Sequence, residues 1–286
     1  MFNTIHQKNS TVIQKNSTVI LPVWLDDFIY SQLGATYCKR NQDMVILEWN
    51  CQQIQEYLGT YFPRSFAEGY TIFQKLIKDK SIDLITSKNI RVLDFGCGTG
   101  GELVGAILAL NNASLDIENI HVKALDGNSY SIKLLEDILA QLSSEIKVDI
   151  IIDPCPTIID DFYDLSTIDK VIGTNFDFII LSKVVCEFAT KQQFDEINPY
   201  LHIIEKLLKK LKSNGLLYVS DITSYNKSSQ KWLGNMMNEA INKVEGCLLL
   251  SNEGVNEAFT VSHSRKKQDV SKIAWRILRP QNNVLL

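Results

Sequence analysis

The residues best suited to chemistry lie in one ten-residue segment, 92–101, which reads VLDFGCGTGG. Glycines at 96, 98 and 100 let the backbone take positive φ angles and approach a ligand without a clash from a Cβ atom. A helix is predicted to follow the loop, and the first N–H groups of a helix have no partners within it. The segment therefore predicts a loop that holds a ligand against its backbone.

Two glycine patterns fit this loop, and they predict different ligands. Positions 96, 98 and 101 satisfy GxGxxG, the dinucleotide pattern, whereas positions 96, 98 and 100 follow Asp94 as DxGxGxG. The Asp94 carboxylate would repel a pyrophosphate and attract an ammonium or sulfonium group. The acid that ends the next strand, Asp126, lies thirty residues after Gly96, while the dinucleotide pattern places its acid about twenty residues on. Both observations favour the second pattern over the dinucleotide pattern, and the first also favours a cationic ligand.

Strands and helices alternate around this loop. Apolar runs predict strands at 90–95, 121–125, 146–152, 176–181, 216–220, 247–250 and 273–278, and helical spacing predicts helices at 102–110, 129–142, 197–211 and 228–244. The segment between the last two strands fits neither pattern clearly. Alternation of this kind predicts an open, mostly parallel sheet with helices on both faces. Ligands of such sheets bind beyond the carboxyl ends of the strands.

The chain before residue 81 follows another pattern. The seven-residue segment QKNSTVI occurs twice in tandem, at 7–13 and 14–20. Residues 1–21 are predicted to form a flexible polar leader. Residues 22–80 are predicted to form a helical cap of three helices, because apolar residues recur at three-to-four spacing. Pro63 is expected to end the second helix and to open the third.

Residues 92–101 resemble the first motif of class I S-adenosylmethionine-dependent methyltransferases, a hydrophobic residue followed by LDxGxGxG. The likeness extends over residues 90–250 and includes Asp126, the run FDFII at 176–180 and the turn NGLL at 214–217. It implies an α/β, Rossmann-like class I methyltransferase fold, with a seven-stranded mostly parallel sheet and an N-terminal helical cap. Residues 81–286 would then form the S-adenosylmethionine-binding domain.

The resemblance implies a set of cofactor-binding residues near the carboxyl ends of the strands: Asp94, Gly96, Cys97, Gly98, Gly100, Asp126, Gly127, Asn128, Asp160, Asp161, Ser182 and Lys183. In this set Asp94 and the loop backbone hold the methionine moiety. Asp126 accepts the two ribose hydroxyls, because a carboxylate offers two acceptor oxygens to a diol. Gly127 and Asn128 lie along the adenosine.

The adenine and sulfonium contacts follow less directly from the pattern. Asp160 or Asp161 is preferred to Asp153 for the adenine amino group, because their spacing to the fourth strand is more usual in this family. Ser182 and Lys183, just after that strand, would face the sulfonium.

Three further residues are candidates on the same rim. Arg64, beside Pro63, is a candidate to bind the cofactor carboxylate from the cap, with an ordinary surface charge as the alternative. Glu187 and Asp221 are candidate catalytic residues that would bind an acceptor amine or take its proton. Their alternatives are an exposed acid at a helix start and a turn or cap residue. The hypothesised reaction is in-line attack on the cofactor methyl group, which depends mainly on placement.

Composition limits the partners. The 286 residues carry a net charge of −4, which argues against long nucleic acid acceptors and favours a small-molecule or peptide acceptor. The six cysteines form no CxxC pair and the four histidines lie near no second ligand, which argues against a zinc site. Scattered single cysteines predict a reduced, cytoplasmic protein. No apolar run is long enough to cross a membrane.

Two other functions fit parts of the pattern. A nicotinamide-dependent oxidoreductase would use the same glycines through GxGxxG. A non-catalytic assembly subunit would keep the fold without the reaction. The segment YFPRS at 61–65 slightly resembles the caps of ribosome-associated methyltransferase-like proteins, but intact Asp94 and Asp126 argue against a degenerate pocket.

Overall fold

The computed structural model describes residues 13–15, 17–38, 49–80, 87–113, 115–146, 148–159, 165–189, 198–226, 229–251 and 254–281. Its strands are β1 (Ile13–Lys15), β2 (Thr18–Ile20), β3 (Asn89–Phe95), β4 (Asn119–Asp126), β5 (Asp149–Pro156), β6 (Phe176–Ser182), β7 (Leu211–Ile222), β8 (Tyr225–Asn226), β9 (Lys231–Trp232), β10 (Cys247–Ser251), β11 (Glu257–His263) and β12 (Lys266–Pro280). The helices are α1 (Val23–Asp27), the π-helix η2 (Phe28–Gln32), α2 (Cys51–Lys78), α3 (Gly101–Asn112), α4 (Ser129–Glu145), α5 (Ser166–Ile172), α6 (Val185–Ala189), α7 (Pro199–Leu208) and α8 (Leu233–Ile241).

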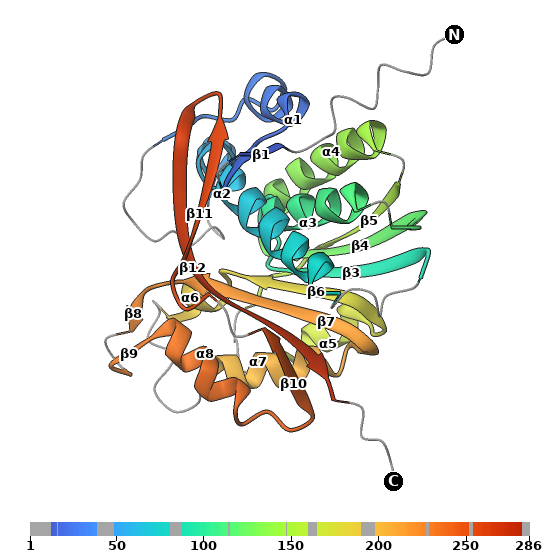
Figure 1. Ribbon diagram of the computed structural model, residues 1–286, viewed down its shortest axis with the longest axis vertical. Helices are drawn as coiled ribbons and strands as arrows, with labels where there is room; N and C mark the ends of the chain where they lie inside the picture. Colours follow the sequence, from blue (N-terminus) through green and yellow to red (C-terminus); the bar gives the residue numbers. More distant parts are fainter. Residues whose placement is uncertain are drawn as a thin grey trace.

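A ten-stranded sheet forms the centre of the molecule (Figure 1). Its order is β1-β2-β11-β12-β7-β6-β3-β4-β5, and β10 also pairs with β12. The five strands from β7 to β5 run parallel, and β12 lies antiparallel to β7. The predicted α/β fold with a mostly parallel sheet is confirmed. It has ten strands rather than seven because β1, β2 and β11 extend one edge.

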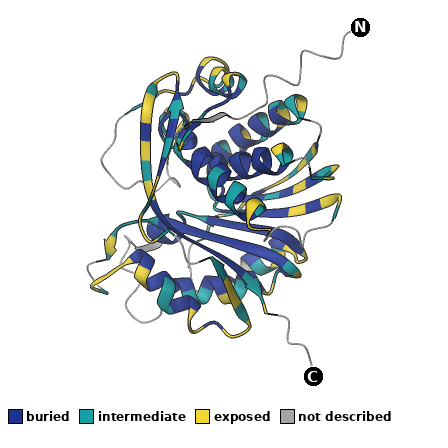
Figure 2. Cartoon of the chain, viewed as in Figure 1, coloured by how far each residue is buried: buried dark blue, intermediate teal, exposed yellow. Residues whose placement is uncertain are grey.

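Helices cover both faces of this sheet and divide the core in two. One apolar cluster lies between the sheet and α2, α3 and α4, and the other lies between the sheet and α5, α7 and α8 (Figure 1). Six of the seven residues of β6 are buried, as expected of a central strand covered on both faces (Figure 2). The outer strand β5 contains Pro154 and Pro156, which an edge strand tolerates because its outer N–H groups pair with no neighbour.

The long helix α2, which we call the cap helix, contradicts the predicted break at Pro63. One continuous helix includes this proline. A proline has no N–H group to donate to the carbonyl four residues earlier, here that of Gly59. The Tyr30 hydroxyl donates to that carbonyl instead, at 2.5 Å. The missing bond is thus replaced by a side chain from η2, which the sequence pattern could not reveal.

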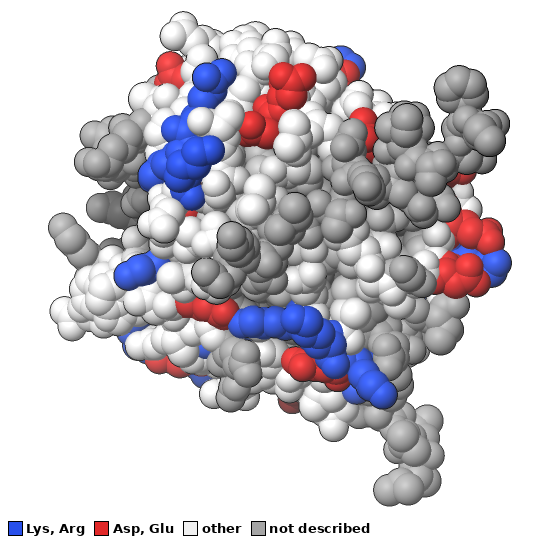
Figure 3. Space-filling model, turned by 45° about the horizontal axis from the view of Figure 1, so that its top comes forward, with Lys and Arg blue, Asp and Glu red and all other residues white. Residues whose placement is uncertain are grey.

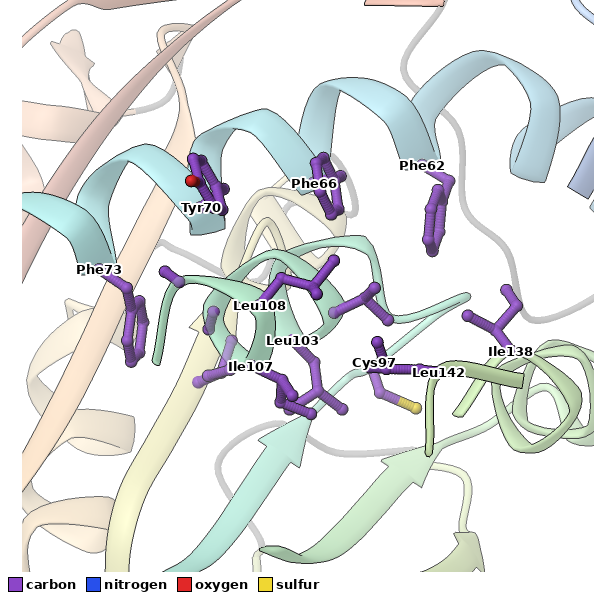
Figure 4. Close-up of a cluster of buried hydrophobic side chains, with 14 of the residues drawn as sticks. Phe62, Phe66, Tyr70, Phe73, Cys97, Leu103, Ile107, Leu108, Ile138 and Leu142 are labelled. Atoms are coloured by element: carbon purple, nitrogen blue, oxygen red, sulfur yellow. The ribbon is translucent and has the colours of Figure 1, made fainter. Parts of the chain in front are cut away.

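The cap helix packs directly on α3, the helix that follows the glycine loop. A Cβ atom on Gly69 would lie 2.2 Å from the Glu102 carbonyl oxygen, and one on Gly105 would lie 2.2 Å from that of Phe66. Around this backbone contact, aromatic side chains of α2 lie over aliphatic side chains of α3 (Figure 4). Glycines therefore let the two helices approach closely, and the cap helix is fixed relative to the loop.

The second copy of the seven-residue repeat contributes to the sheet. Its last three residues form β2, which pairs in parallel with β11, and Val19 is buried in the core. The first copy lies outside the described residues except for Ile13, in β1. In the segment between the last two predicted strands, which fitted no pattern, residues 257–263 form β11 and residues 266–272 form the first half of β12.

Two helices near the carboxyl end of the chain are shorter than predicted. The predicted helices at 197–211 and 228–244 are α7 and α8, and the second is preceded by the small hairpin of β8 and β9.

Candidate functional site

The glycine loop joins β3 to α3 and is tied to the end of β4. The backbone N–H groups of Gly96 and Cys97 donate to the Leu125 carbonyl at 2.8 and 2.9 Å. Gly96 has a φ of +72°, and a Cβ atom there would lie 2.4 Å from Val184. Gly100 has a φ of +76° and precedes the first residue of α3. The left-handed conformation that the sequence predicted is therefore present, and only glycine fits it at both positions.

Asp126 ends β4 and holds the loop from the side. Its carboxylate accepts hydrogen bonds from the N–H groups of Gly98 and Asn128, each at 2.8 Å. Burial raises the pKa of Asp126, although these backbone donors and that of Gly127 oppose the shift. The N-cap of α4 is Asn128, whose side chain accepts from the second and third residues of the helix. Asp126 therefore supports the loop, whereas Asn128 caps α4.

Asp94 is the most unusual acid of the site. Its side chain is only 4% exposed, and no hydrogen-bond or ion-pair partner for its carboxylate is found within the described parts of the chain. Burial raises its pKa well above the ordinary value, and the nearby charges of Glu102 and Asp126 add to this shift. A buried carboxylate without a partner is costly unless a ligand supplies a positively charged donor.

Lys183 and Ser182 meet a different partner from the one expected. The Lys183 ammonium lies 2.6 Å from a carboxylate oxygen of Glu68 and 2.6 Å from one of Glu102, and it donates to the Ser65 hydroxyl at 2.8 Å. Ser182 donates to the same Glu102 oxygen at 2.7 Å. Both residues predicted to face the sulfonium are thus bonded to acids of α2 and α3, and no sequence pattern selects these acids.

The charges in this group are coupled. Burial raises the pKa of Glu68, which is completely inaccessible to solvent. At Glu102 burial acts in the same direction, but Lys183 and Ser182 outweigh it and lower the pKa. The two carboxylates raise the pKa of Lys183 despite its burial. Lys183 is therefore charged at neutral pH and serves as a counter-ion inside the protein.

The two candidate catalytic residues lie in different surroundings. Asp221 is completely buried, and its carboxylate accepts from the Cys186 N–H at 2.9 Å, the Tyr200 hydroxyl at 2.7 Å and its own neighbour Ile222 at 2.8 Å. This placement supports the alternative interpretation, in which Asp221 anchors the start of α6. Glu187 lies in α6 and is only half-buried, and its charge is close enough to the cap helix to affect the pKa of Tyr57.

Arg64 faces the β11–β12 hairpin. Its guanidinium lies 2.9 Å from a carboxylate oxygen of Asp269 and over the ring of Tyr61. Burial disfavours the ionised form of Asp269, but its contacts with His263, Lys266 and Arg64 lower its pKa to about 2. The structure therefore gives Arg64 a carboxylate partner within this chain.

The two acids preferred for the adenine contact, Asp160 and Asp161, lie outside the described residues. Asp153 does not follow the third parallel strand but lies within it, where it pairs with Lys123 at 2.7 Å.

Tyr57 of the cap helix belongs to the site and was missed from the sequence. A Cβ atom on Gly98 would lie 3.4 Å from its hydroxyl. Burial raises the pKa of Tyr57 well above its ordinary value, and the charges of Glu102, Glu187 and Asp126 raise it further. The ring stacks on Tyr61, with centroids 5.1 Å apart. Helical spacing identified Tyr57 as apolar surface, but nothing local shows which side of α2 meets the loop.

The described helices are all too short or too polar to cross a membrane. Within the same residues, no three His, Cys, Asp or Glu side chains lie close enough together to hold a metal ion.

No protein-family model matches this sequence, and no curated protein sequence matches it. Solved structures are similar to it at low identity. A candidate class I S-adenosylmethionine-dependent methyltransferase from Listeria monocytogenes is 14% identical, over 82% of this chain and 68% of that chain, with a TM-score of 0.48. The plantazolicin methyltransferase BpumL, solved with SAH, is 12% identical over 90% and 94%, with a TM-score of 0.46. A candidate RNA methyltransferase from Pyrococcus horikoshii is 14% identical over 91% and 98%, with a TM-score of 0.42. The likeness is one of fold.

Proposed function

We propose that this protein binds S-adenosylmethionine at the glycine loop and transfers its methyl group to a small-molecule or peptide acceptor. The observation that carries the proposal is the buried carboxylate of Asp94, which has no partner among the described residues and lies at the end of β3 beside the loop. A buried carboxylate is stabilised by a charged hydrogen-bond donor, and the ammonium of the cofactor's methionine moiety is such a donor.

The rest of the site fits the same ligand. Asp126 already accepts two backbone N–H groups, but each carboxylate oxygen has a second lone pair, so the ribose hydroxyls can still bind. Gly98 brings the loop backbone close to this carboxylate, and Tyr57 covers the loop from the cap. A methionine carboxylate would find N–H groups at the start of α3. These features support a nucleoside that carries positive charge near Asp94.

A nicotinamide dinucleotide is the main alternative. Its pyrophosphate would lie against a loop flanked by Asp94 and Asp126, with Glu102 close behind. The cation that the structure brings to this region is Lys183, which is already held between two glutamates. The excess of negative charge therefore favours S-adenosylmethionine.

Bound S-adenosylmethionine supplies a methyl group activated by its sulfonium. This chain's own residues orient the cofactor and exclude water, and the acceptor must approach in line with the methyl group. Glu187 is the remaining candidate to bind an acceptor amine or to take its proton, because its charge is close enough to affect Tyr57. Asp221 is assigned to anchoring α6, since all its contacts are internal.

The acidic surroundings also bear on the acceptor. A phosphate-rich acceptor would meet the charges of Glu102, Asp126 and Glu187, which are close enough to Tyr57 to raise its pKa. On the face drawn in Figure 3, lysine and arginine side chains form separate groups rather than one continuous basic surface. Both points favour a neutral or cationic acceptor over RNA. Because a candidate RNA methyltransferase is among the similar structures, RNA is included in the test.

Calorimetry with S-adenosylhomocysteine and with NAD⁺ tests the ligand. We expect S-adenosylhomocysteine to bind and NAD⁺ not to bind; the reverse would overturn the proposal. Incubation with methyl-labelled S-adenosylmethionine and separated small-molecule, protein and RNA fractions of a cell extract then tests the reaction. Label in the small-molecule or protein fraction supports the acceptor class, label in RNA corrects it, and tight binding without any transfer favours a non-catalytic subunit.

A further inference from the structure

We propose that Lys183 is a positioning residue for the cofactor site: its ammonium holds the cap helix, the first turn of α3 and the end of β6 in one arrangement around the glycine loop. This inference rests on the proposed function, because the ligand it positions is S-adenosylmethionine. It concerns a buried ion pair network that the expected cofactor contacts do not include.

The contacts join three elements that are far apart in the sequence. Glu68 and Ser65 come from the cap helix, Glu102 comes from the first turn of α3, and Lys183 follows the last residue of β6. The ammonium lies 2.6 Å from each glutamate and 2.8 Å from the serine hydroxyl. One side chain thus fixes the relative position of all three elements.

Each of these elements also touches the glycine loop. Val184, the next residue after Lys183, packs against Gly96: a Cβ atom on Gly96 would lie 2.4 Å from a methyl group of Val184. Glu102 is the second residue of α3, directly after the loop. Tyr57 precedes Glu68 on the cap helix by three turns and lies against Gly98. A shift at Lys183 would therefore be transmitted to three sides of the loop.

The local conformation indicates that this arrangement serves more than stability. Lys183 has a φ of +56°, a left-handed conformation that residues with a Cβ atom rarely adopt. Glu68 is completely buried, and the Ser271 hydroxyl interacts with its carboxylate in addition to Lys183. Apolar residues of similar size often stabilise a fold as well as a buried ion pair does. A left-handed backbone conformation held in place by buried charged groups is typical of functional sites.

Removal of the ammonium has a consequence that depends on pH. In Lys183→Met, Glu68 and Glu102 would face each other in a buried space without a counter-ion. One of them must then bind a proton, so that a carboxylic acid can donate to the remaining carboxylate. The geometry around the loop would be retained better at low pH than at high pH. In the wild type the lysine makes this proton unnecessary.

The experiment measures the dissociation constant of S-adenosylhomocysteine by calorimetry across the mildly acidic to mildly alkaline range, well below each variant's melting temperature. We expect Lys183→Met to bind about tenfold more weakly than the wild type at alkaline pH, and we expect this difference, measured at the same pH for both proteins, to narrow as pH falls. Lys183→Arg keeps the charge and is expected to bind more tightly than Lys183→Met. The control, Lys133→Met, removes a lysine from an exposed pair on α4 and should bind like the wild type.

A double variant separates positioning from folding. In Glu68→Gln/Lys183→Met the glutamine amide can donate to Glu102, so affinity should recover without a proton and its pH dependence should match that of the wild type. Unchanged affinity of Lys183→Met at every pH, with only a lower melting temperature, would overturn the inference and leave a structural ion pair. If the wild type itself binds no S-adenosylhomocysteine, the proposed function fails instead, and the two outcomes are distinct.

Discussion

The hydroxyl of Tyr30 donates a hydrogen bond to the carbonyl oxygen of Gly59, the carbonyl that Pro63 leaves without a helical partner. The same hydroxyl oxygen lies 3.0 Å from Nδ1 of His263, in the β11–β12 hairpin. Since a carbonyl can only accept, the tyrosine proton is directed to Gly59 and His263 must donate from Nδ1. One side chain therefore allows a proline inside the cap helix and joins that helix to the hairpin.

A double-mutant cycle tests this relationship. Tyr30→Phe leaves a buried carbonyl and a buried ring nitrogen without partners, and should lower the free energy of unfolding by about 1–3 kcal/mol. Pro63→Ala restores an N–H group that can donate to Gly59. The double variant should therefore lose less than the sum of the two single changes in urea denaturation. Strict additivity would contradict the replacement of one bond by the other.

Asparagine at position 94 should separate stability from binding. Asp94→Asn removes a buried charge that has no partner among the described residues, and should raise the free energy of unfolding by on the order of 1 kcal/mol. It should also abolish calorimetric binding of S-adenosylmethionine, because an amide cannot form the ion pair with the ammonium. Asp137→Asn, on an exposed helix surface, is the control and should change neither quantity appreciably. A less stable variant that binds normally would contradict the role given to Asp94.

The raised pKa of Asp94 predicts that binding depends on pH. Below this raised pKa the free protein carries a proton on Asp94, which must be released when the ammonium binds, so affinity should fall as pH falls. The pH dependence of the free energy of unfolding has the opposite sign. The folded state holds the Asp94 proton more tightly than the unfolded state, so the stability gained from this proton is lost as pH rises from the ordinary pKa through the raised one. Calorimetry in two buffers with different ionisation enthalpies measures the released proton. The same binding enthalpy in both buffers would contradict a released proton.

Tyr57 is expected to act as a neutral hydrogen-bond donor over the loop. Its hydroxyl has no partner among the described residues and stays protonated, because burial and the neighbouring acids raise its pKa. Tyr57→Phe should weaken S-adenosylhomocysteine binding about threefold to tenfold and leave the melting temperature nearly unchanged. Tyr225→Phe, on an exposed hairpin, is the matched control. Equal binding by both variants would remove Tyr57 from the site.

The contact between the cap helix and α3 predicts a large effect of one methyl group. Gly105→Ala would place a Cβ atom 2.2 Å from the Phe66 carbonyl oxygen, so the helices must separate. We expect a loss of at least about 3 kcal/mol in urea denaturation. Gly246→Ala is the control: its φ is +68°, but no atom lies within 4 Å of the added methyl group. It should cost only about 1–2 kcal/mol of backbone strain.

What the sequence could predict is local. A strand, three glycines and a helix follow one another within residues 90–110, and the parallel sheet follows from the alternation of apolar runs. The relation between Asp94 and Asp126 was also accessible, because adjacent parallel strands end at the same edge. The fold and the loop were therefore readable without a structure.

Contacts between distant segments were not readable. Lys183 and Glu68 are separated by more than a hundred residues, and no local pattern selects the helix surface from which Glu68 reaches the sheet. Arg64 was noticed as a charge on the cap, but its partner Asp269 lies in a segment whose pattern fitted no element. Asp221 was chosen for its place at a strand end, whereas its burial depends on Tyr200 and α6. Such partners are set by tertiary packing.

The parallel pairing of β2 with β11 shows what the duplicated seven-residue segment means for the edge of the sheet. Residues 11–13 carry the same letters, TVI, as the strand at 18–20. A chain that lost seven residues here would still present the same valine to the interior and the same pattern of backbone donors to β11. The duplication therefore makes this edge of the sheet tolerant of a deletion of seven residues. A deletion of a single residue would instead turn the valine outward.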